Sequence, residues 1–524
     1  MFANLGALHL RRRLPKSAEI VVIGPESRGG MPVVGESTIE ITAQFLENRL
    51  GLGPYLRDHH YPKYGLTYYF KLDPDNPADR RYSVHSTERG HDSLAPLEGG
   101  WGGPMARPPA WQLNRTVFDR DLRRFVDEAG VERIHGTVRG IELDGRNGHT
   151  VTVEREDGTT TKERADWIVD ATGRRSVLGR QLGLRLQSEI QRDVFWFRLS
   201  NFDRRKLFDL DWLGPMPPGP GSDYHHDRYY ATHHFMGRGH WIWMIPLRSP
   251  TDEELISIGI STRCGVYPGS VRTMDEFMAQ VATTNPMITD LVKTGHVEDT
   301  NVYRKFHYNS KQAYSPDRWA IVGDAAFTPD ALFSNGLAFG VIQLDQVGEM
   351  IARDCERDHD PGYIQRLERA LWPPLSYNQW NIGYWYDTMD DPYLSSFRVT
   401  WTEMGYFYVL LPLVASGAHY DPAMMPAWEV LQVPESRVRE TDFGLVPQVL
   451  AARKLFDKAR PEHFIYRGKI KINSQAMTKA KSLEELKQHI RAGAVIRQDY
   501  LRDVVAQVEV AERIVTKRAP EFSL

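Results

Sequence analysis

Large apolar side chains fill the segment 241–245 without interruption, as Trp-Ile-Trp-Met-Ile. Because side chains alternate between the two faces of a strand, this run predicts a strand with Trp241 and Trp243 on one face and Ile242 and Met244 on the other. Two neighbouring indoles form a rigid apolar wall, which can pack a core or line a cavity. The pattern alone leaves both interpretations open.

Other periodic stretches predict the elements around this strand. Residues 114–130 place apolar side chains on one helical face, with Asn114 as the expected N-cap and Gly130 as the stop. From 137 to 172, short alternating segments are separated by Asn-Gly and Asp-Gly pairs, which favour tight hairpins. This part of the chain is therefore expected to form a β-meander that ends in an apolar strand.

The order of the elements indicates the domain organisation. A helix and a strand open the chain, the meander follows, strand-like runs fill 190–310, and "RWAIVGDAA" at 318–326 predicts a buried strand, a glycine turn and a helix. The remainder reads as helical and closes with a charged helix near 482–517. We expect a nucleotide-binding α/β domain in two parts (1–188 and 301–370), a β-sheet substrate domain inserted between them (189–300) and a mainly helical region (371–524).

Length and composition narrow the class of protein. A chain of 524 residues is too long for one core, so several domains are expected. The formal net charge of −3 gives no electrostatic reason to expect a nucleic acid or an anionic membrane as partner. Two distant cysteines, Cys264 and Cys355, exclude a disulfide scaffold and fit a reducing cytoplasm. The longest apolar run, at 406–418, is too short to span a bilayer.

Two of the predicted strands lead into a short segment that contains an acidic residue and a glycine, in "IVDATG" at 168–173 and "AIVGDAA" at 320–326. Glycine allows a ligand to approach the backbone, and the start of a helix favours an anion such as a phosphate. Asp324 is placed to accept a hydrogen bond from a sugar hydroxyl, or to cap the helix that follows. Each motif alone is weak evidence, but their order and separation are informative.

Four motifs occur in an order that resembles the flavin-dependent halogenases, a tryptophan-halogenase-like branch of the FAD-dependent monooxygenases. They are "VVGEST" at 33–38, "DATG" at 170–173 with the later "VGDAA", "WIWMIP" at 241–246, and "FTPDALFSNG" at 327–336. The resemblance covers roughly residues 5–400. It implies a three-layer, glutathione-reductase-like FAD-binding domain with the inserted sheet domain and the helical C-terminal region.

The resemblance also implies an activity and its residues. In that family, reduced FAD, oxygen and a halide produce hypohalous acid, which moves to a lysine, and Lys63 in "YPKYG" is the matching lysine here. Trp241 and Trp243 would wall the passage between flavin and substrate. Chloride or bromide would be the halide, and a separate flavin reductase would supply reduced FAD. The positions matching the cofactor site are Gly35, Glu36, Ser37, Thr38, Arg115, Asp170, Gly173, Gly323 and Asp324, and those matching the halide region are Ser334, Asn335 and Gly336.

Two departures from the family concern the cofactor and the substrate. The family opens with a strand and Gly-x-Gly-x-x-Gly, whereas this sequence begins near the end of that motif. We expect that the true start lies upstream of Met1. The alternative is that the chain is a homologue that has lost strong flavin binding. Gly24 stands where a ribose-binding carboxylate is expected, and Glu26 is the nearest substitute. Phe333 replaces the glutamate of tryptophan halogenases, which favours a phenolic, pyrrolic or carrier-bound aromatic over free tryptophan.

Other interpretations remain open at this point. The chain could be a flavin-dependent hydroxylase or reductase of the same fold, or a non-catalytic homologue that binds a ligand in an aromatic cavity. Lys63 could simply lie over neighbouring tyrosines, Arg115 and Asp119 could be exposed helical charges, and 334–336 could be an ordinary turn. No metal site is expected, because no metal-ligand spacing occurs among the clustered histidines His225, His226, His233, His234 and His240.

Overall fold

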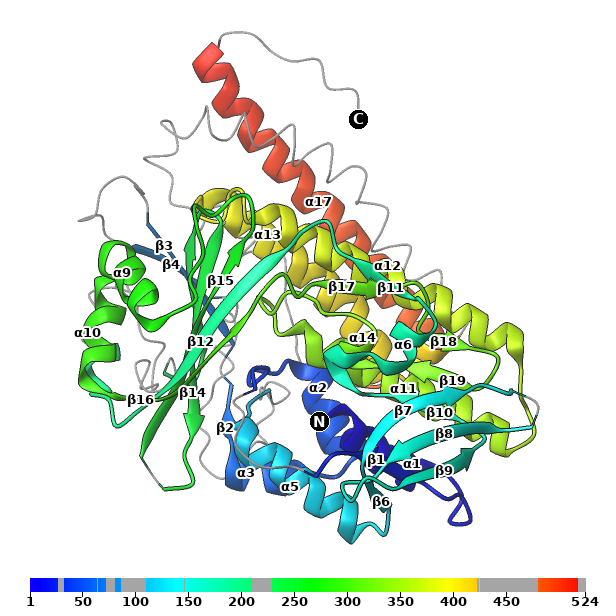
Figure 1. Ribbon diagram of the computed structural model, residues 1–524. Coiled ribbons are helices and arrows are strands. Elements are labelled where there is room, and N and C mark those ends of the chain that lie inside the picture. Colours follow the sequence, from blue (N-terminus) through cyan, green and yellow to red (C-terminus); the bar gives the residue numbers. More distant parts are fainter. Residues whose placement is uncertain are drawn as a thin grey trace.

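The computed structural model describes residues 1–26, 33–63, 65–71, 81–85, 110–145, 147–208, 229–251, 253–421, 424 and 479–516. Two bodies that each contain strands lie side by side, and long helices of the C-terminal half run across them (Figure 1). His225 and His226 lie outside the described residues.

A twisted seven-stranded sheet forms the core of one body. Strand β14 (His240–Arg248) contains both tryptophans, and the register with its neighbour places Trp241 opposite Ser261 and Trp243 opposite Gly259. The strands lie in the order β16 (His296–Tyr303), β12 (Arg192–Ser200), β15 (Glu254–Arg263), β14, β13 (Thr232–Gly237), β3 (Leu66–Lys71) and β4 (Arg81–His85). The sheet therefore takes two strands from residues 66–85 and extends to 303, so it is not limited to the interval 189–300.

The predicted alternation along β14 is confirmed by the packing on its two faces. Ile242 and Met244 are fully buried on the face covered by α9 (Met274–Thr284) and α10 (Pro286–Thr294). Trp241 and Trp243 belong to a different buried cluster, together with Trp385 at the end of α12 (Pro361–Trp385). Both faces of the sheet are thus covered, which explains why the strand is apolar at every position.

The second body contains two pairs of parallel strands. Strand β1 (Val21–Gly24) pairs with β6 (Glu132–His135), and β10 (Ile168–Asp170) pairs with β19 (Trp319–Ile321), which also bonds the antiparallel β18 (Tyr314–Ser315). Within the described part of the chain, β1 and β10 each have a partner strand on one side only. The predicted meander is present as β7 (Thr137–Glu142), β8 (His149–Glu154) and β9 (Thr160–Ala165).

Helix α1 (Phe2–Arg13) packs against α11 (Asn335–Cys355), and the ring of Phe2 lies directly against Gly340 of α11 and against Gly323. A Cβ atom at Gly340 would lie 2.2 Å from the ring of Phe2, and one at Gly323 would lie 2.3 Å from the same ring. Since real side chains do not approach so closely, only glycine at these positions lets Phe2 reach the start of the turn after β19.

The described residues of the C-terminal region are mainly helical, as predicted. Helix α12 starts at Pro361, ahead of the expected boundary at 371, and is followed by α13 (Pro392–Gly405), a π-helical turn (Tyr406–Leu410), α14 (Leu411–Ala415) and α17 (Leu483–Thr516). No helix in the described ranges has the length and apolar character that a membrane crossing requires.

Candidate active site

The loop at 35–38 and Lys63 contact a segment that lies some 300 residues further along the sequence. The Lys63 ammonium is buried and donates a hydrogen bond to the Thr38 carbonyl at 2.7 Å and one to Ser334 Oγ at 3.4 Å. Ser334 Oγ in turn bonds Ser37 Oγ at 3.0 Å, and Ser37 Oγ lies 2.9 Å from Thr232 Oγ1. The fold therefore brings together Lys63 and members of both the cofactor and halide sets.

The predicted halide segment forms the N-terminal end of a 21-residue helix. Ser334 has a left-handed backbone (φ 58°) at the N-cap of α11, and its side chain does not cap the helix. Asn335 is buried, and its side-chain Nδ2 has no hydrogen-bond partner among the described residues. A helix N-terminus and an unpaired buried N–H donor are together suited to an anion, because both place positive charge at the same point.

A cavity opens beside Lys63 and Asn335. Carboxylates are contributed by Glu40 and Glu403, and Tyr406 donates a hydrogen bond to Glu40 Oε2 at 2.9 Å. The other residues that line it are Thr38, Ile39, Gly65, Leu66, Ala110, Phe333, Thr402 and Phe407. Aromatic and aliphatic walls with a few convergent polar groups are the usual makeup of a site for a small aromatic ligand.

A second cluster of charged groups lies around Arg115 and Asp119 at the start of α5 (Arg115–Glu128), in the second body. Arg115 is buried; it holds Asp119 in a forked pair, with Nη2 to Oδ2 at 2.7 Å, and donates to the Val34 carbonyl at 2.7 Å. The interpretation of Arg115 as an exposed surface charge is therefore wrong. Asn114 does sit at the N-cap, but its amide donates to the Arg248 carbonyl and does not cap the helix, which corrects that prediction.

Glu36 and Tyr303 extend this cluster. Burial raises the pKa of Glu36 to about 7, against the opposing effects of a hydrogen bond from Ser257 and the charge of Arg115. Tyr303 at the end of β16 is in electrostatic contact with Arg115, Glu36 and Asp324. A carboxyl group that changes charge near neutral pH is more common in functional sites than elsewhere.

The turns after the parallel strands differ in part from the prediction. Gly323 and Asp324 lie in a 3-10 turn (Gly323–Ala325), and the long helix starts only at Asn335, so the expected α-helix N-terminus at Asp324 is wrong. The Gly323 N–H already donates to Gln343 Oε1 at 2.8 Å, whereas the Asp324 side chain is exposed. Asp170 accepts hydrogen bonds from the backbone of Thr172 and Leu178, which shapes the turn that presents Gly173 at φ 61°.

Each of the two tryptophans contacts a residue that neighbours the charged cluster or Lys63. Trp243 Nε1 donates to Ser257 Oγ at 3.3 Å, and Ser257 is the residue that also bonds Glu36. Trp241 lies on the other side, with its ring centroid 5.3 Å from that of His234. His234 is buried, and its pKa is well below the usual value because of burial and the nearby charge of Lys63. Both indoles are buried in a core cluster; that they also wall the passage between flavin and substrate stays a prediction.

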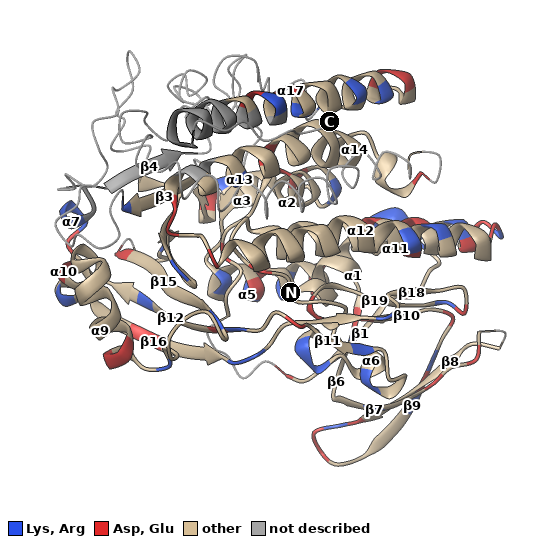
Figure 2. Ribbon diagram, turned by 90° about the horizontal axis from the view of Figure 1, so that it is seen from above, with Lys and Arg blue, Asp and Glu red and all other residues tan. Residues whose placement is uncertain are grey.

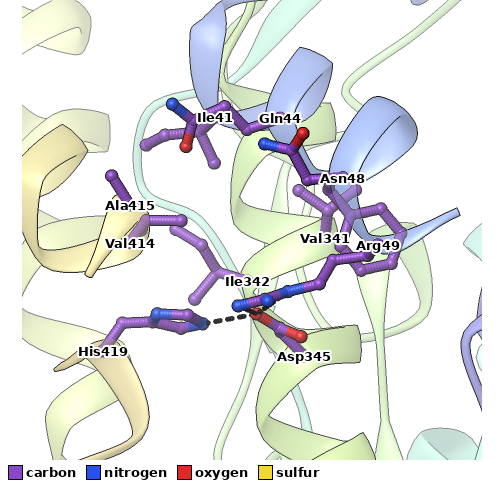
Figure 3. Close-up of a pocket in the computed structure, with 11 residues that line it drawn as sticks. Ile41, Gln44, Asn48, Arg49, Val341, Ile342, Asp345, Val414, Ala415 and His419 are labelled. Carbon is purple, nitrogen blue, oxygen red and sulfur yellow. Dashed lines mark hydrogen bonds and ion pairs between the residues drawn. The ribbon is translucent and has the colours of Figure 1, made fainter. Parts of the chain in front are cut away.

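One buried charged cluster had no sequence signal. Asp345 on α11 lies 3.1 Å from His419 Nε2 and 3.2 Å from Arg49 Nη2 (Figure 3). It also lies 3.2 Å from His9 Nε2. Burial would raise the pKa of Asp345, but the contacts with His419, His9 and Arg49 more than offset it and hold the pKa far below its usual range. These four residues come from four separate segments, so no local pattern could reveal the cluster.

Comparisons with known proteins agree with this architecture. A family model described as tryptophan halogenase matches residues 80–197. The flavin-dependent halogenase chlA of Dictyostelium discoideum is 27% identical over 447 residues, which cover 79% of this chain and 69% of that protein. The tetracycline 7-halogenase of Kitasatospora aureofaciens is 30% identical over 273 residues (48% of this chain, 46% of that protein).

One further relative has a named substrate, and one solved structure has a similar fold. The 1H-pyrrole-2-carbonyl-[peptidyl-carrier protein] chlorinase of Pseudomonas fluorescens is 27% identical over 44% of this chain and 47% of its own length. The crystal structure of halogenase PltM in complex with phloroglucinol and FAD superposes with a TM-score of 0.64 over 94% of both chains at 18% identity, a likeness of fold.

The parallel strand pairs, the turns that follow them and the large antiparallel sheet match the fold of the FAD-binding halogenase structures. The family model and the related sequences point to the same family. Over the matched residues, the chain is similar to the flavin-dependent halogenases.

Proposed function

We propose that this protein halogenates an electron-rich aromatic compound with reduced FAD, oxygen and chloride or bromide. The observation that carries the proposal is the buried Lys63 ammonium, which lies between Ser334 at the start of α11 and a cavity lined by aromatic residues and carboxylates. The named activities of the relatives, on tetracycline and on a carrier-bound pyrrole, support the same class of substrate.

The charged cluster on the second body fits a flavin dinucleotide. The guanidinium of Arg115 would attract the negatively charged groups of FAD. The exposed Asp324 carboxylate would accept hydrogen bonds from ribityl hydroxyls. Glu36, Ser37 and Thr38 connect this cluster to Lys63 through the Thr38 carbonyl. Bound reduced FAD would supply, from oxygen and halide, the hypohalous acid that halogenates the substrate.

Lys63 and Asn335 would then hold the reagent at the cavity. The ammonium of Lys63 and the unpaired Nδ2 of Asn335 both offer N–H donors to a halide ion or to hypohalous acid. Transfer of the electrophilic halogen forms a carbon–halogen bond, and the ring carbon loses its proton. Glu40 and Glu403 line the same cavity and can accept that proton and pass it to the hydroxide released when the oxygen–halogen bond breaks, which gives water as the other product.

The cavity also limits the substrate. Phe333 forms part of its wall and stacks near Trp385, with ring centroids 5.8 Å apart. A phenol or pyrrole, small or carrier-bound, has a flat apolar body for this wall and an O–H or N–H donor for the carboxylates. We further propose that a separate flavin reductase supplies reduced FAD and that the protein works in the cytoplasm, where its free cysteines, Cys264 and Cys355, stay reduced.

The test combines flavin binding with a product assay. The visible spectrum of the purified protein with added FAD should show a protein-bound flavin, in this chain or in a form extended by the upstream codons. With chemically reduced FAD, oxygen and bromide, a phenol panel should yield brominated product, and Lys63→Met should abolish it while the flavin spectrum is retained. The control Lys311→Met changes an exposed lysine and should keep full activity. Hydroxylated product without halide, or full bromination by Lys63→Met, would refute the proposal.

A further inference from the structure

Six cationic side chains surround one open pocket between the two bodies. They come from the turn Gly173–Arg175, from α6 (Val177–Gln181) and its surroundings, from β11 (Arg185–Gln187), and from the loop that follows β16. Figure 2 shows Lys and Arg positions gathered around α6 and β11. The lining consists of Arg174, Arg175, Arg180, Arg185, Arg304, Lys305 and Phe306, and we refer to it as the cationic pocket.

None of the six forms an ion pair with a carboxylate in the described part of the chain. Two of them lie over aromatic rings instead: Arg174 is 3.5 Å from the ring centroid of Tyr303, and Arg185 is 3.7 Å from that of Tyr308. Burial lowers the pKa of Arg185, and repulsion from Arg180 and Arg174 lowers it further. Like charges held together without direct ion pairs are unfavourable, so a bound anion would stabilise this arrangement.

The cationic pocket adjoins the charged cluster that we assign to the flavin. Arg174 directly follows Gly173, stacks on Tyr303 of that cluster and is in electrostatic contact with Asp324. Tyr308, under Arg185, donates a hydrogen bond to the Asp324 carbonyl. An anion attracted to the pocket therefore arrives beside the flavin residues and not beside the substrate cavity at Lys63.

We propose that the cationic pocket captures reduced FAD from solution and guides it to the cluster at Glu36, Arg115 and Asp324. The inference rests on the proposed function, which requires reduced flavin to come from outside. The pyrophosphate of FAD carries two negative charges, and a concave patch of one sign raises association rates of an oppositely charged ligand by about 10 to 1,000-fold. Charges at the rim of a site act mainly on the association rate and on its salt dependence.

The experiment compares two triple variants with equal changes in charge. Arg180→Gln/Arg304→Gln/Lys305→Gln removes three exposed charges of the pocket. The control, Lys206→Gln/Arg272→Gln/Lys293→Gln, removes three exposed charges around α9 and α10, on the other body. Anaerobic stopped-flow mixing with chemically reduced FAD gives the association and dissociation rates at low and high salt.

We expect the pocket variant to associate at least about tenfold more slowly at low salt, with a flatter salt dependence and a smaller change in dissociation rate. The control variant should keep the rate and salt dependence of the natural protein. Equal association rates and salt slopes for the pocket variant would overturn the inference while leaving the proposed function intact. A protein that binds no FAD in any form would overturn both.

An acidic protein is the competing occupant, and the same variants test it. If the pocket variant takes up free reduced FAD normally but loses turnover only when a flavin reductase or an acidic carrier protein is present, the pocket binds that protein and the proposal for FAD is wrong.

Discussion

Replacing Asp345 by asparagine tests whether the buried cluster on α11 holds the C-terminal region onto the second body. The Asp345 side chain is 6% exposed, and its partners His9 and His419 are 4% and 0% exposed. Asparagine has nearly the same shape but carries no charge, and it keeps only one carbonyl acceptor for two imidazoles and a guanidinium. The variant therefore removes the counter-charge of the cluster with little change in packing.

The magnitude follows from the burial of the partners. Removing the charged partner of a buried hydrogen-bonding group costs about 1.5–3 kcal/mol, and Asp345 lies against two buried imidazoles; the contact with Arg49, which is 39% exposed, adds at most about 1 kcal/mol. Because asparagine retains one acceptor, we expect about 3 kcal/mol. At about 2–4 °C per kcal/mol for a domain of 150–250 residues, the Tm should fall by roughly 6–12 °C.

Differential scanning fluorimetry at several pH values measures this effect. The contacts keep the pKa of Asp345 below the unfolded value of about 4, so their stabilisation is fully present above pH 4 and is lost as the pH falls through the lower folded pKa. The Tm difference should therefore be constant from pH 6 to 8 and narrow below pH 4. The matched control is Asp358→Asn, which breaks an ion pair with Arg353 in which Asp358 is 58% exposed and should shift the Tm by no more than about 4 °C. A shift for Asp345→Asn no larger than the control's would refute the reasoning.

Three further variants test other parts of the site. Burial raises the pKa of Glu36 to about 7, so its ionisation destabilises the folded state as the pH rises from about 4 past 7. Compared with the natural protein, Glu36→Gln should therefore raise the Tm at pH 8, by the equivalent of about 3 kcal/mol, and leave it unchanged at pH 4. A difference independent of pH would contradict this. Gly259→Ala would place a Cβ 2.1 Å from the Trp243 ring, and we expect a loss of about 1–3 kcal/mol with an altered near-UV circular dichroism spectrum; an unchanged spectrum would show that the indole does not depend on the glycine. Tyr386→Phe removes the hydroxyl that bonds both Trp241 Nε1 and Asp330 Oδ2 at 2.7 Å, so urea unfolding should show a loss of about 1–3 kcal/mol, and no loss would mean that other groups satisfy both atoms.

The sequence by itself determined the local elements and the class of chemistry. Alternation along 241–245 predicted which indoles share a face, and the apolar face of 114–130 predicted α5, because these periods depend only on neighbouring residues. The four motifs pointed to a resemblance to the flavin-dependent halogenases, and the related sequences show the same similarity. Even so, Asn114 does not cap α5: its Nδ2 donates to the distant Arg248 carbonyl, and its Oδ1, the atom that would accept from the helix N–H groups, has no partner among the described residues.

Only the tertiary structure decided which of these segments meet. Lys63 and Ser334 are 271 positions apart, β3 joins the sheet beside β13, and Asp345 collects partners from the first helix and from residue 419. Such contacts depend on the shape and charge of surfaces that exist only after the elements have packed. The cationic pocket illustrates the same point: its arginines and lysine come from residues 174–185 and 304–305, which are ordinary charged positions in the sequence, and they become one anion-attracting surface because the fold places those segments side by side.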